Sequence, residues 1–508
     1  MKFSKVKQSV PALMIVIIIA KLVGMLREVV LANYFGTSNV SDAYLIASSV
    51  PTLLFYFIGH SISTSYIPMY SKVKNDLGEK SSIRYTNYII NIAMIFATVF
   101  VAILLIWPEI VIKIFASGFD AETVSLTAKL IRISAVSMYL MILVNVLGGY
   151  LNANKNFIVP AAVSLPRNAM IIISIVIAAK LGYEWLGIGL LCAYVAECIL
   201  IVPFAFNKGY RYKPDISFKD KYVQETWYVI VPILIGMFVG QINKIIDKSI
   251  ASNVVEGGIS ALTYASVINT AVQEVLVTGL ITVLFSKCAE WVVKGEHDKV
   301  KKQLSSTLNT LAFFLIPATI GVIILARPIV TLVLGRGAFD ENSTTMTVGA
   351  LCFYTSGLFF LAARDTLVKV FYAYKETKIT TVTSILAIVL KIVLSLILYK
   401  IMGLNGLAFS TAISALFNSI VLYVLFNKRI GDVGFKSLVI TMIKTFISCA
   451  GMALTIYGLN LVVTGLNSMV MLVLSVLAGM LIYFVISFIL KQAPLMDMLD
   501  KIKKQNIK

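Results

Sequence analysis

The sequence contains few charged residues for its length. Asp, Glu, Lys and Arg make up 14% of the 508 residues, and 59% of the residues are hydrophobic. A soluble protein carries about 25% charged residues. Long apolar runs recur along the whole chain. This composition excludes an ordinary soluble domain and predicts an all-α polytopic membrane protein.

Residues that build enzyme active sites are also scarce. With only two histidines, His-based metal sites and Ser-His triads lack the groups they need. There is no P-loop, and the Gly-x-Gly at 187–189 lies in an apolar run rather than after a strand. The five cysteines all lie in apolar runs without disulfide-framework or metal-ligand spacing. We therefore expect a transporter, channel or scaffold that is not an enzyme and has no metal or other cofactor.

Acidic residues are outnumbered by basic ones. The chain has 44 Lys and Arg against 25 Asp and Glu, which gives a formal net charge of +19. The basic residues cluster in alternate loops, with 27 on one side of the predicted membrane and four on the other. Because basic loops stay in the cytoplasm, this pattern predicts that both termini are cytoplasmic. Orientation and contact with anionic membrane lipids account for the charge, so no nucleic-acid partner is expected.

The apolar runs are long enough to cross a membrane many times. A membrane-spanning helix needs about 20 mostly apolar residues. Fourteen stretches meet this requirement, at roughly 10–34, 42–68, 87–112, 124–151, 157–180, 185–206, 226–251, 260–288, 305–333, 345–373, 379–400, 404–426, 438–462 and 467–490.

Short motifs recur about 220 residues apart. Pro108 and Pro328 begin similar stretches, and Gly-Phe-Asp at 118–120 returns as Ala-Phe-Asp at 338–340. These matches predict two homologous six-helix lobes in the same membrane orientation, with the substrate path between them. The predicted organisation is an N-lobe at 1–206, a C-lobe at 223–428, two further helices at 436–490 and a basic cytoplasmic tail at 491–508.

Ionisable residues inside the apolar runs carry the strongest functional signal. Such groups are costly at membrane depth unless they face a wet cavity or a partner. The first predicted hairpin contains Lys21, Arg27, Glu28 and Asp42. Arg27 either lines a substrate cavity or pairs with Asp42 across the hairpin. The carboxylate of Asp42 also suits the positive dipole at the start of a helix.

Further candidates lie in later helices. Arg167 follows Pro166, where a break in a helix can expose the backbone to a cavity. Lys244, Asp247 and Lys248 lie within about one helical turn, so they either neutralise one another or serve a cavity. The candidate substrate-contacting residues are Lys21, Arg27, Asp42, Arg167, Lys244 and Lys248, and the candidate ion-coupling residue is Asp247.

Several stretches resemble the MurJ/MviN family. These are GMLREVVLANYFGTSNVSDAYLIASSVPTLLF at 24–55, GHSISTSYIPMYSK at 59–72, VLGGYLNANKNFIVPA at 146–161 and VFYAYKETK at 370–378. The family belongs to the superfamily of multidrug, oligosaccharidyl-lipid and polysaccharide exporters. The resemblance runs from about residue 10 to residue 428, and the two additional C-terminal helices are also typical of the family.

This resemblance implies a flippase of the bacterial cytoplasmic membrane that serves peptidoglycan synthesis. The expected cargo is an undecaprenyl-pyrophosphate-linked saccharide, above all lipid II, moved from the inner to the outer leaflet by alternating access. A cationic central cavity would hold the pyrophosphate, and a groove beside the last two helices would hold the lipid tail. The resemblance requires no oligomer, so we expect a monomer, driven by Na⁺ or by the membrane potential.

The resemblance also assigns roles to individual residues. Arg27 and Asp42 match the functional arginine and aspartate of the first two helices in the family. Lys21 stands where many members carry another arginine, so the charge is kept but the bidentate geometry is lost. Asp247 lies near an aspartate that contributes to a sodium site in some members.

Two positions depart from the family pattern. Many members have an arginine near Phe55 and another near Val267. Arg167, Lys244 or Lys248 are the candidates to replace these missing cations. The departures keep a second cargo open, a lipid-linked precursor of a capsule or secondary wall polymer. A multidrug/cation antiporter is a further alternative, although it would want an acidic cavity, and a non-transporting scaffold is another.

Overall fold

The computed structural model describes residues 3–463 and 466–506. Side chains are described for these residues except 3–11, 56–64, 229–240, 275, 278, 283 and 501–506. Helices make up nearly all of the described chain, and no strand occurs within it. The predicted all-α class is therefore confirmed.

The chain forms two compact units. Unit 1 comprises residues 1–260 and 336–340, and unit 2 comprises residues 261–335 and 341–508. The helices of unit 1 are α1 (Phe3–Phe35), α2 (Asn39–Leu77), α3 (Glu79–Ile106), α4 (Pro108–Phe115), α5 (Ala121–Ala135), α6 (Ser137–Ala153), α7 (Ile158–Ala162), α8 (Ser164–Leu181), α9 (Glu184–Asn207) and α10 (Lys221–Val254).

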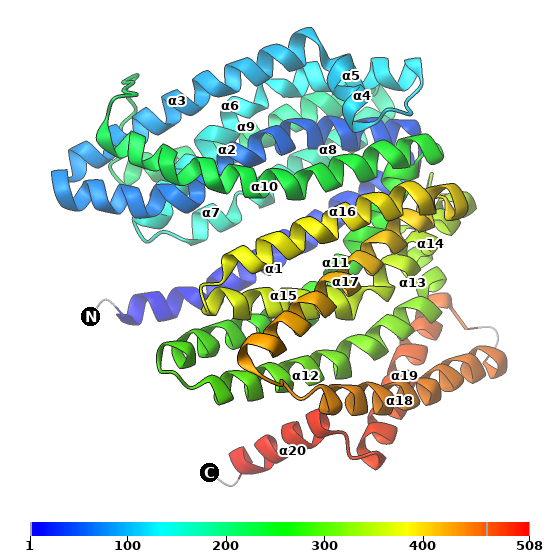
Figure 1. Cartoon of the computed structure of the whole chain (residues 1–508). Coiled ribbons are helices and arrows are strands. Elements are labelled where there is room, and N and C mark those ends of the chain that lie inside the picture. Colours follow the sequence, from blue (N-terminus) through cyan, green and yellow to red (C-terminus); the bar gives the residue numbers. More distant parts are fainter. Residues whose placement is uncertain (1–2, 464–465, 507–508) are drawn as a thin grey trace. The chain divides into compact units, whose positions relative to one another are not determined.

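Within unit 1 the long helices run side by side (Figure 1). The helix α2 packs against α3, α5, α6 and α10, while α8 packs between α1 and α9. Helix starts follow local sequence signals, since the side chain of Asp220 accepts hydrogen bonds from the first amides of α10. The packing of α10 on α2 places this helix in unit 1. The predicted lobe boundary lies before residue 223, but it rests on sequence repeats rather than packing and stays a prediction.

The segment 336–340 packs against the end of α1. The amide of Ala338 donates to the carbonyl of Asn33 at 2.8 Å. Gly36 and Gly337 both have positive φ, and a Cβ atom on either would collide with backbone of the opposing segment. Only glycine allows this close approach of the two backbones.

Unit 2 contains the remaining helices. The helix α11 (Gly258–Val293) begins at the end of unit 1 and continues into unit 2. The others are α12 (His297–Ile324), α13 (Ala326–Leu334), α14 (Glu341–Ser356), α15 (Leu358–Ala373), α16 (Thr377–Met402), α17 (Leu404–Ile430), α18 (Phe435–Val462), α19 (Ser468–Ile489) and α20 (Ala493–Asn506).

The core of unit 2 joins its last long helices to α12. Phe313 on α12 packs against Tyr483 on α19, and the hydroxyl of Tyr483 donates to the carbonyl of Phe313 at 2.6 Å. The helices α18 and α19 pack against each other and both contact α12. A polar cluster of Thr445, Ser448 and Gln492 is buried beside them and is internally hydrogen-bonded. The two C-terminal helices are therefore fixed to the rest of unit 2 by both apolar and polar contacts.

Many of these helices could cross a membrane. In the described part of the chain, eight single helices are long and apolar enough, and three bent pairs bring the number to eleven. The bends resemble each other in position. The pair α5 and α6 is bent by 46°, and the pair α14 and α15, which begins 220 residues later, is bent by 43°. The same order of helix breaks thus recurs at the spacing of the sequence motifs.

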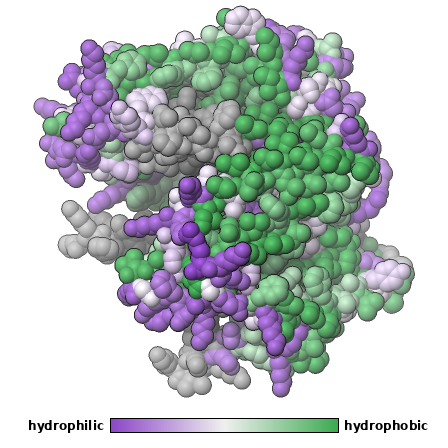
Figure 2. All heavy atoms as spheres, viewed as in Figure 1, coloured by the Kyte–Doolittle hydropathy of each residue, from purple (hydrophilic) through white to green (hydrophobic). Residues whose placement is uncertain are grey.

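The surface agrees with a membrane environment. On the face drawn in Figure 2, many hydrophobic side chains are exposed, and hydrophilic side chains gather in separate patches. The helices α18 and α19, for example, expose large apolar side chains such as Leu454, Tyr457 and Leu481. Exposed apolar surface on this scale is stable in lipid rather than in water.

Candidate functional site

The first part of the site is built around Arg27 on α1. Its side chain is 28% exposed, and its Nε and Nη2 atoms both donate to Oε1 of Glu28, Nε at 3.2 Å. Its Nη1 atom donates to Oδ1 of Asn168 on α8 at 3.3 Å. The side chain of Glu28 is 6% exposed, and its Oε2 atom is buried without a hydrogen-bond partner. Arg27 is therefore a half-open cation held in place from two helices.

The second part of the site is a similar pair on α8 and α9. The Nη1 atom of Arg167 lies 3.3 Å from Oε1 of Glu197. The arginine side chain is 34% exposed, whereas the glutamate side chain is only 3% exposed. The Nε atom of Arg167 is buried and donates to nothing in the described structure. A cation with an unused donor is suited to bind an additional anionic oxygen.

The two pairs belong to one cluster. Tyr44 on α2 and Tyr194 on α9 each interact electrostatically with both Arg27 and Arg167. Arg167 and Asn168 are adjacent on α8. Asn168 contacts Arg27 and Arg167 contacts Glu197, so this helix links the two pairs. Four helices thus gather two guanidinium groups and two buried carboxylates. The described cluster is charge-balanced, with both cations more open than their counterions.

Asp42 has a different position from the one expected for a partner of Arg27. It is 1% exposed and accepts hydrogen bonds from the amides of Ile259 at 3.2 Å and Ser260 at 2.7 Å. These amides belong to the first turn of α11, where backbone donors lack helical partners. The predicted alternative of an Arg27–Asp42 ion pair is therefore wrong, because both carboxylate oxygens of Asp42 cap a helix and Arg27 has Glu28.

The three charged residues of α10 lie on different parts of its surface. Lys244 is exposed, whereas Asp247 and Lys248 are half-buried. The Nζ atom of Lys248 lies 3.4 Å from the carbonyl oxygen of Leu45 on α2. Lys248 also interacts electrostatically with Asp42 and Glu28. Lys248 therefore extends the charged cluster toward α10.

The remaining predicted positions differ in their exposure. Lys21 is exposed on α1, about one and a half turns before Arg27. Phe55 is buried in α2, and Val267 is half-buried in α11. Sequence reasoning left Glu28 and Glu197 out of the candidate site and missed Asn168, Tyr44 and Tyr194. The available signals were adjacency, since Asn168 follows Arg167, and helical spacing, since Tyr194 lies three residues before Glu197.

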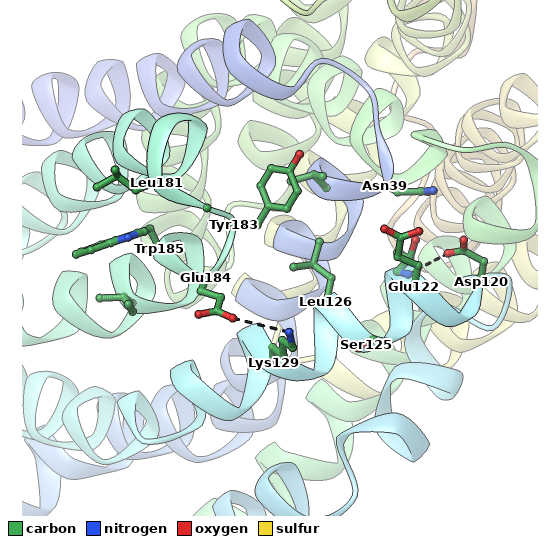
Figure 3. Close-up of a pocket in the computed structure, with 14 residues that line it drawn as sticks. Asn39, Asp120, Glu122, Ser125, Leu126, Lys129, Leu181, Tyr183, Glu184 and Trp185 are labelled. Carbon is green, nitrogen blue, oxygen red and sulfur yellow. Dashed lines mark hydrogen bonds and ion pairs between the residues drawn. The ribbon is translucent and has the colours of Figure 1, made fainter.

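A separate cavity in unit 1 was not predicted. It has a volume of about 690 Å³ and lies where the starts of α2, α5 and α9 meet (Figure 3). Lys129 and Glu184 form an ion pair across it at 3.8 Å. The hydroxyl and amide of Thr123 hydrogen-bond the carboxylate of Asp120 and hold its pKa below the usual value. Lys129 and Glu184 pair with each other and Asp120 caps α5, so the arginine cluster is the better candidate site.

The chain matches known proteins over most of its length. Residues 31–489 match the family described as "Lipid II flippase MurJ". A protein of Thermosipho africanus named "Lipid II flippase MurJ" is 27% identical over 411 residues, covering 81% of this chain and 83% of its own. A "Probable lipid II flippase MurJ" of Thermotoga maritima is 26% identical over 397 residues, covering 78% and 80% respectively.

Solved structures give the same result. A structure titled "Lipid II flippase MurJ, inward closed conformation" matches with a TM-score of 0.81 and 27% identity, covering 94% of this chain and 98% of its own. An inward-facing multidrug resistance MATE transporter of the MOP superfamily matches with a TM-score of 0.70 at 14% identity, which shows a shared fold alone. The resemblance seen in the sequence is thus confirmed, and the chain belongs to the lipid II flippase MurJ family.

Proposed function

We propose that this protein moves lipid II from the inner to the outer leaflet of the bacterial cytoplasmic membrane. Its membership in the MurJ family and the names of its relatives support this cargo over a capsule precursor or a multidrug substrate. One structural observation carries the proposal at the level of chemistry. Arg27 and Arg167 form a half-open pair of guanidinium groups among four helices of unit 1.

The chemistry of the cargo requires such a site. Moving an unpaired ionised group from water into an apolar medium costs on the order of tens of kcal/mol. A pyrophosphate therefore needs replacement solvation throughout its passage across the hydrocarbon. Arginine is suited to this role because its planar fork donates two parallel hydrogen bonds to phosphate oxygens. In the proposal, Arg27 and Arg167 contact the pyrophosphate, and Lys21, Lys244 and Lys248 supply further positive charge.

Within this proposal the carboxylates position the cations. Glu28 and Asn168 fix the guanidinium plane of Arg27, and Glu197 holds Arg167. Asp42 supports the site indirectly through the start of α11. We also infer fourteen membrane spans with both termini cytoplasmic, which agrees with the recurring helix bends and the basic loops.

The energy source is part of the proposal as well. An inside-negative potential favours outward movement of an anion by about 2.3 kcal/mol per charge per 100 mV. The carboxylate of Asp247 is the candidate for coupling to Na⁺. The exposed apolar surface of α18 and α19 is the candidate groove for the undecaprenyl tail. No oligomer is needed for any of these steps.

A growth experiment tests the proposal. The full chain is expressed in a bacterium whose own lipid II flippase is depleted, and we expect the chain alone to sustain growth and normal cell shape. Lysis despite normal expression and membrane insertion would contradict lipid II as the cargo. Restoration of capsule or wall-polymer export in the corresponding mutant, without rescue of growth, would identify the alternative cargo.

A further inference from the structure

Glu197 is a buried carboxylate with one charged neighbour. Its side chain is 3% exposed and lies 3.3 Å from Arg167. Within the described structure, Arg167 is the charged group that interacts with it. The other titratable groups beside it are Tyr194 and Cys198, which lie on its own helix. Its ionised form therefore depends on a single arginine.

Glu28 differs from Glu197 in this respect. Glu28 accepts hydrogen bonds from two nitrogen atoms of Arg27. It also interacts with the ammonium group of Lys248, which reaches the cluster from α10. If Arg27 turned toward a bound anion, Glu28 would still be near a cation. Glu197 has no such second cation in the described structure.

Among the residues whose side chains the structure describes, the other helices around α9 bring no further charged group that interacts with Glu197. The helices α2, α5, α6, α7 and α8 pack against α9. The described titratable groups on these helices include Tyr44, which interacts with Arg27 and Arg167, and Lys129, which pairs with Glu184 near the start of α9. Neither one substitutes for Arg167.

This arrangement has a consequence for anion binding. Arg167 has an unused Nε donor, but this atom is buried, so turning the guanidinium group to present it to an anionic ligand loosens the contact with Glu197. A buried carboxylate that loses its counterion is strongly destabilised, because its charge is left unpaired away from water. Taking up a proton removes this penalty, because a neutral carboxyl tolerates burial far better than a carboxylate.

We propose that Glu197 is a proton-binding site linked to the pyrophosphate cargo, an inference that rests on the proposed function. As Arg167 moves from Glu197 to a phosphate oxygen, a proton from cavity water bonds to a carboxylate oxygen of Glu197. When the cargo leaves, Arg167 returns and the proton goes back to water. No oxidation or other group transfer is involved. The cargo then crosses the membrane with about one less net negative charge.

The sign of the pH dependence follows from this linkage. Because binding takes up a proton, cargo affinity rises as pH falls, by up to about tenfold per pH unit while Glu197 is ionised in the free protein. Replacing Glu197 by a neutral isostere removes the dependence. A purely structural role for Glu197 would change stability but would leave the proton count of binding unchanged.

The test measures protons and binding together. The purified full chain in detergent is titrated with a polyprenyl-diphosphate N-acetylglucosamine diester, whose phosphates stay fully ionised near neutral pH. A pH indicator in weak buffer reports proton uptake, and calorimetry reports affinity between pH 6 and pH 8. We expect about one proton taken up per bound lipid for the wild type and none for Glu197→Gln. The matched control Asp215→Asn, at an exposed arginine pair with the same 3.3 Å separation, should keep the uptake.

The outcomes separate this inference from the proposed function. No binding of the diester by the wild type would contradict the proposed function itself. Binding without proton uptake, or equal uptake by wild type and Glu197→Gln, would overturn the proton site alone. If Glu197→Gln does not fold, the wild-type measurement decides, since pH-independent affinity with no uptake also overturns it.

Discussion

Two arginine–carboxylate pairs of unit 1 have the same separation and opposite surroundings. Arg84 and Asp215 approach within 3.3 Å at the start of α3, with side chains that are 63% and 36% exposed. Arg167 and Glu197 also approach within 3.3 Å, but Glu197 is 3% exposed. An exposed pair contributes about 0 to 1 kcal/mol to stability, because water solvates either partner alone. The buried pair is different because its carboxylate depends on its arginine.

The distance within an ion pair therefore does not by itself identify a functional charge. The chain has many ion pairs at helix ends, and their geometry resembles that of the central cluster. The pairs Arg27–Glu28 and Arg167–Glu197 differ from the ion pairs at helix ends because their carboxylates are buried while their arginines are partly exposed. An anion can reach such an arginine. The buried carboxylate then loses its counterion and, in the proposal above, takes up a proton.

The largest expected effect is the loss of transport in Arg27→Ala. Truncating a partly buried, hydrogen-bonded charge at a binding site costs about 3 kcal/mol, which corresponds to about a 100-fold loss. We expect Arg27→Ala to fail to support growth in the flippase-depletion strain although it reaches the membrane. Arg84→Ala, at the exposed pair, should support normal growth. Equal growth of both variants would contradict the distinction between the two regions.

The next effect is on stability. Arg167→Ala leaves Glu197 buried without its counterion, so we expect a loss of about 3 kcal/mol at pH 8. The loss should shrink at lower pH as the carboxyl group takes up a proton. Arg84→Ala should cost less than about 1 kcal/mol at either pH. Denaturant unfolding of the three proteins in detergent measures the difference, and similar losses for both variants would count against it.

A smaller contrast separates two helix caps. Asp42 accepts two successive amides of α11, and Asp220 accepts two successive amides of α10. Because Asp42 is 1% exposed, Asp42→Ala leaves buried donors unsatisfied and should cost about 2 kcal/mol. Water can reach the half-buried cap at Asp220, so Asp220→Ala should cost about 1 kcal/mol. Unfolding midpoints in the reverse order would show that burial does not govern these caps.

The smallest effect belongs to the ion pair in the cavity of Figure 3. Lys129 and Glu184 are 3.8 Å apart, and both side chains are more than half exposed. We expect Lys129→Ala to change stability by less than about 0.5 kcal/mol and transport not at all. A clear transport defect in this variant, with normal expression, would give that cavity a role that the arginine cluster alone does not explain.

Much of the fold could be predicted from the sequence because hydrophobic runs decide it. The all-α class and the family were predicted correctly, and Arg27 was selected as a candidate because a charge in an apolar run is conspicuous. Its partner was not found. The sequence pattern left Asp42 open as a partner of Arg27, whereas the contacts come from the adjacent Glu28 and from Asn168 on another helix.

The errors have a common physical origin. Asp42 binds backbone amides, and backbone donors leave no signature in a sequence. The contact between Arg167 and Glu197 depends on the packing of α8 on α9, which hydrophobic periodicity does not specify residue by residue. Charges at membrane depth could therefore be listed from the sequence, whereas their pairing required the structure.

The most direct test of the central claim is translocation by the purified protein. Wild-type protein and Arg27→Ala are reconstituted into liposomes that contain labelled lipid II, and a membrane-impermeant enzyme reports how much label reaches the outer leaflet. We expect labelled lipid II to reach the outer leaflet rapidly with wild-type protein. With Arg27→Ala it should appear there only at the rate seen in protein-free liposomes. Wild-type rates in Arg27→Ala would contradict the assignment of the arginine cluster as the pyrophosphate site.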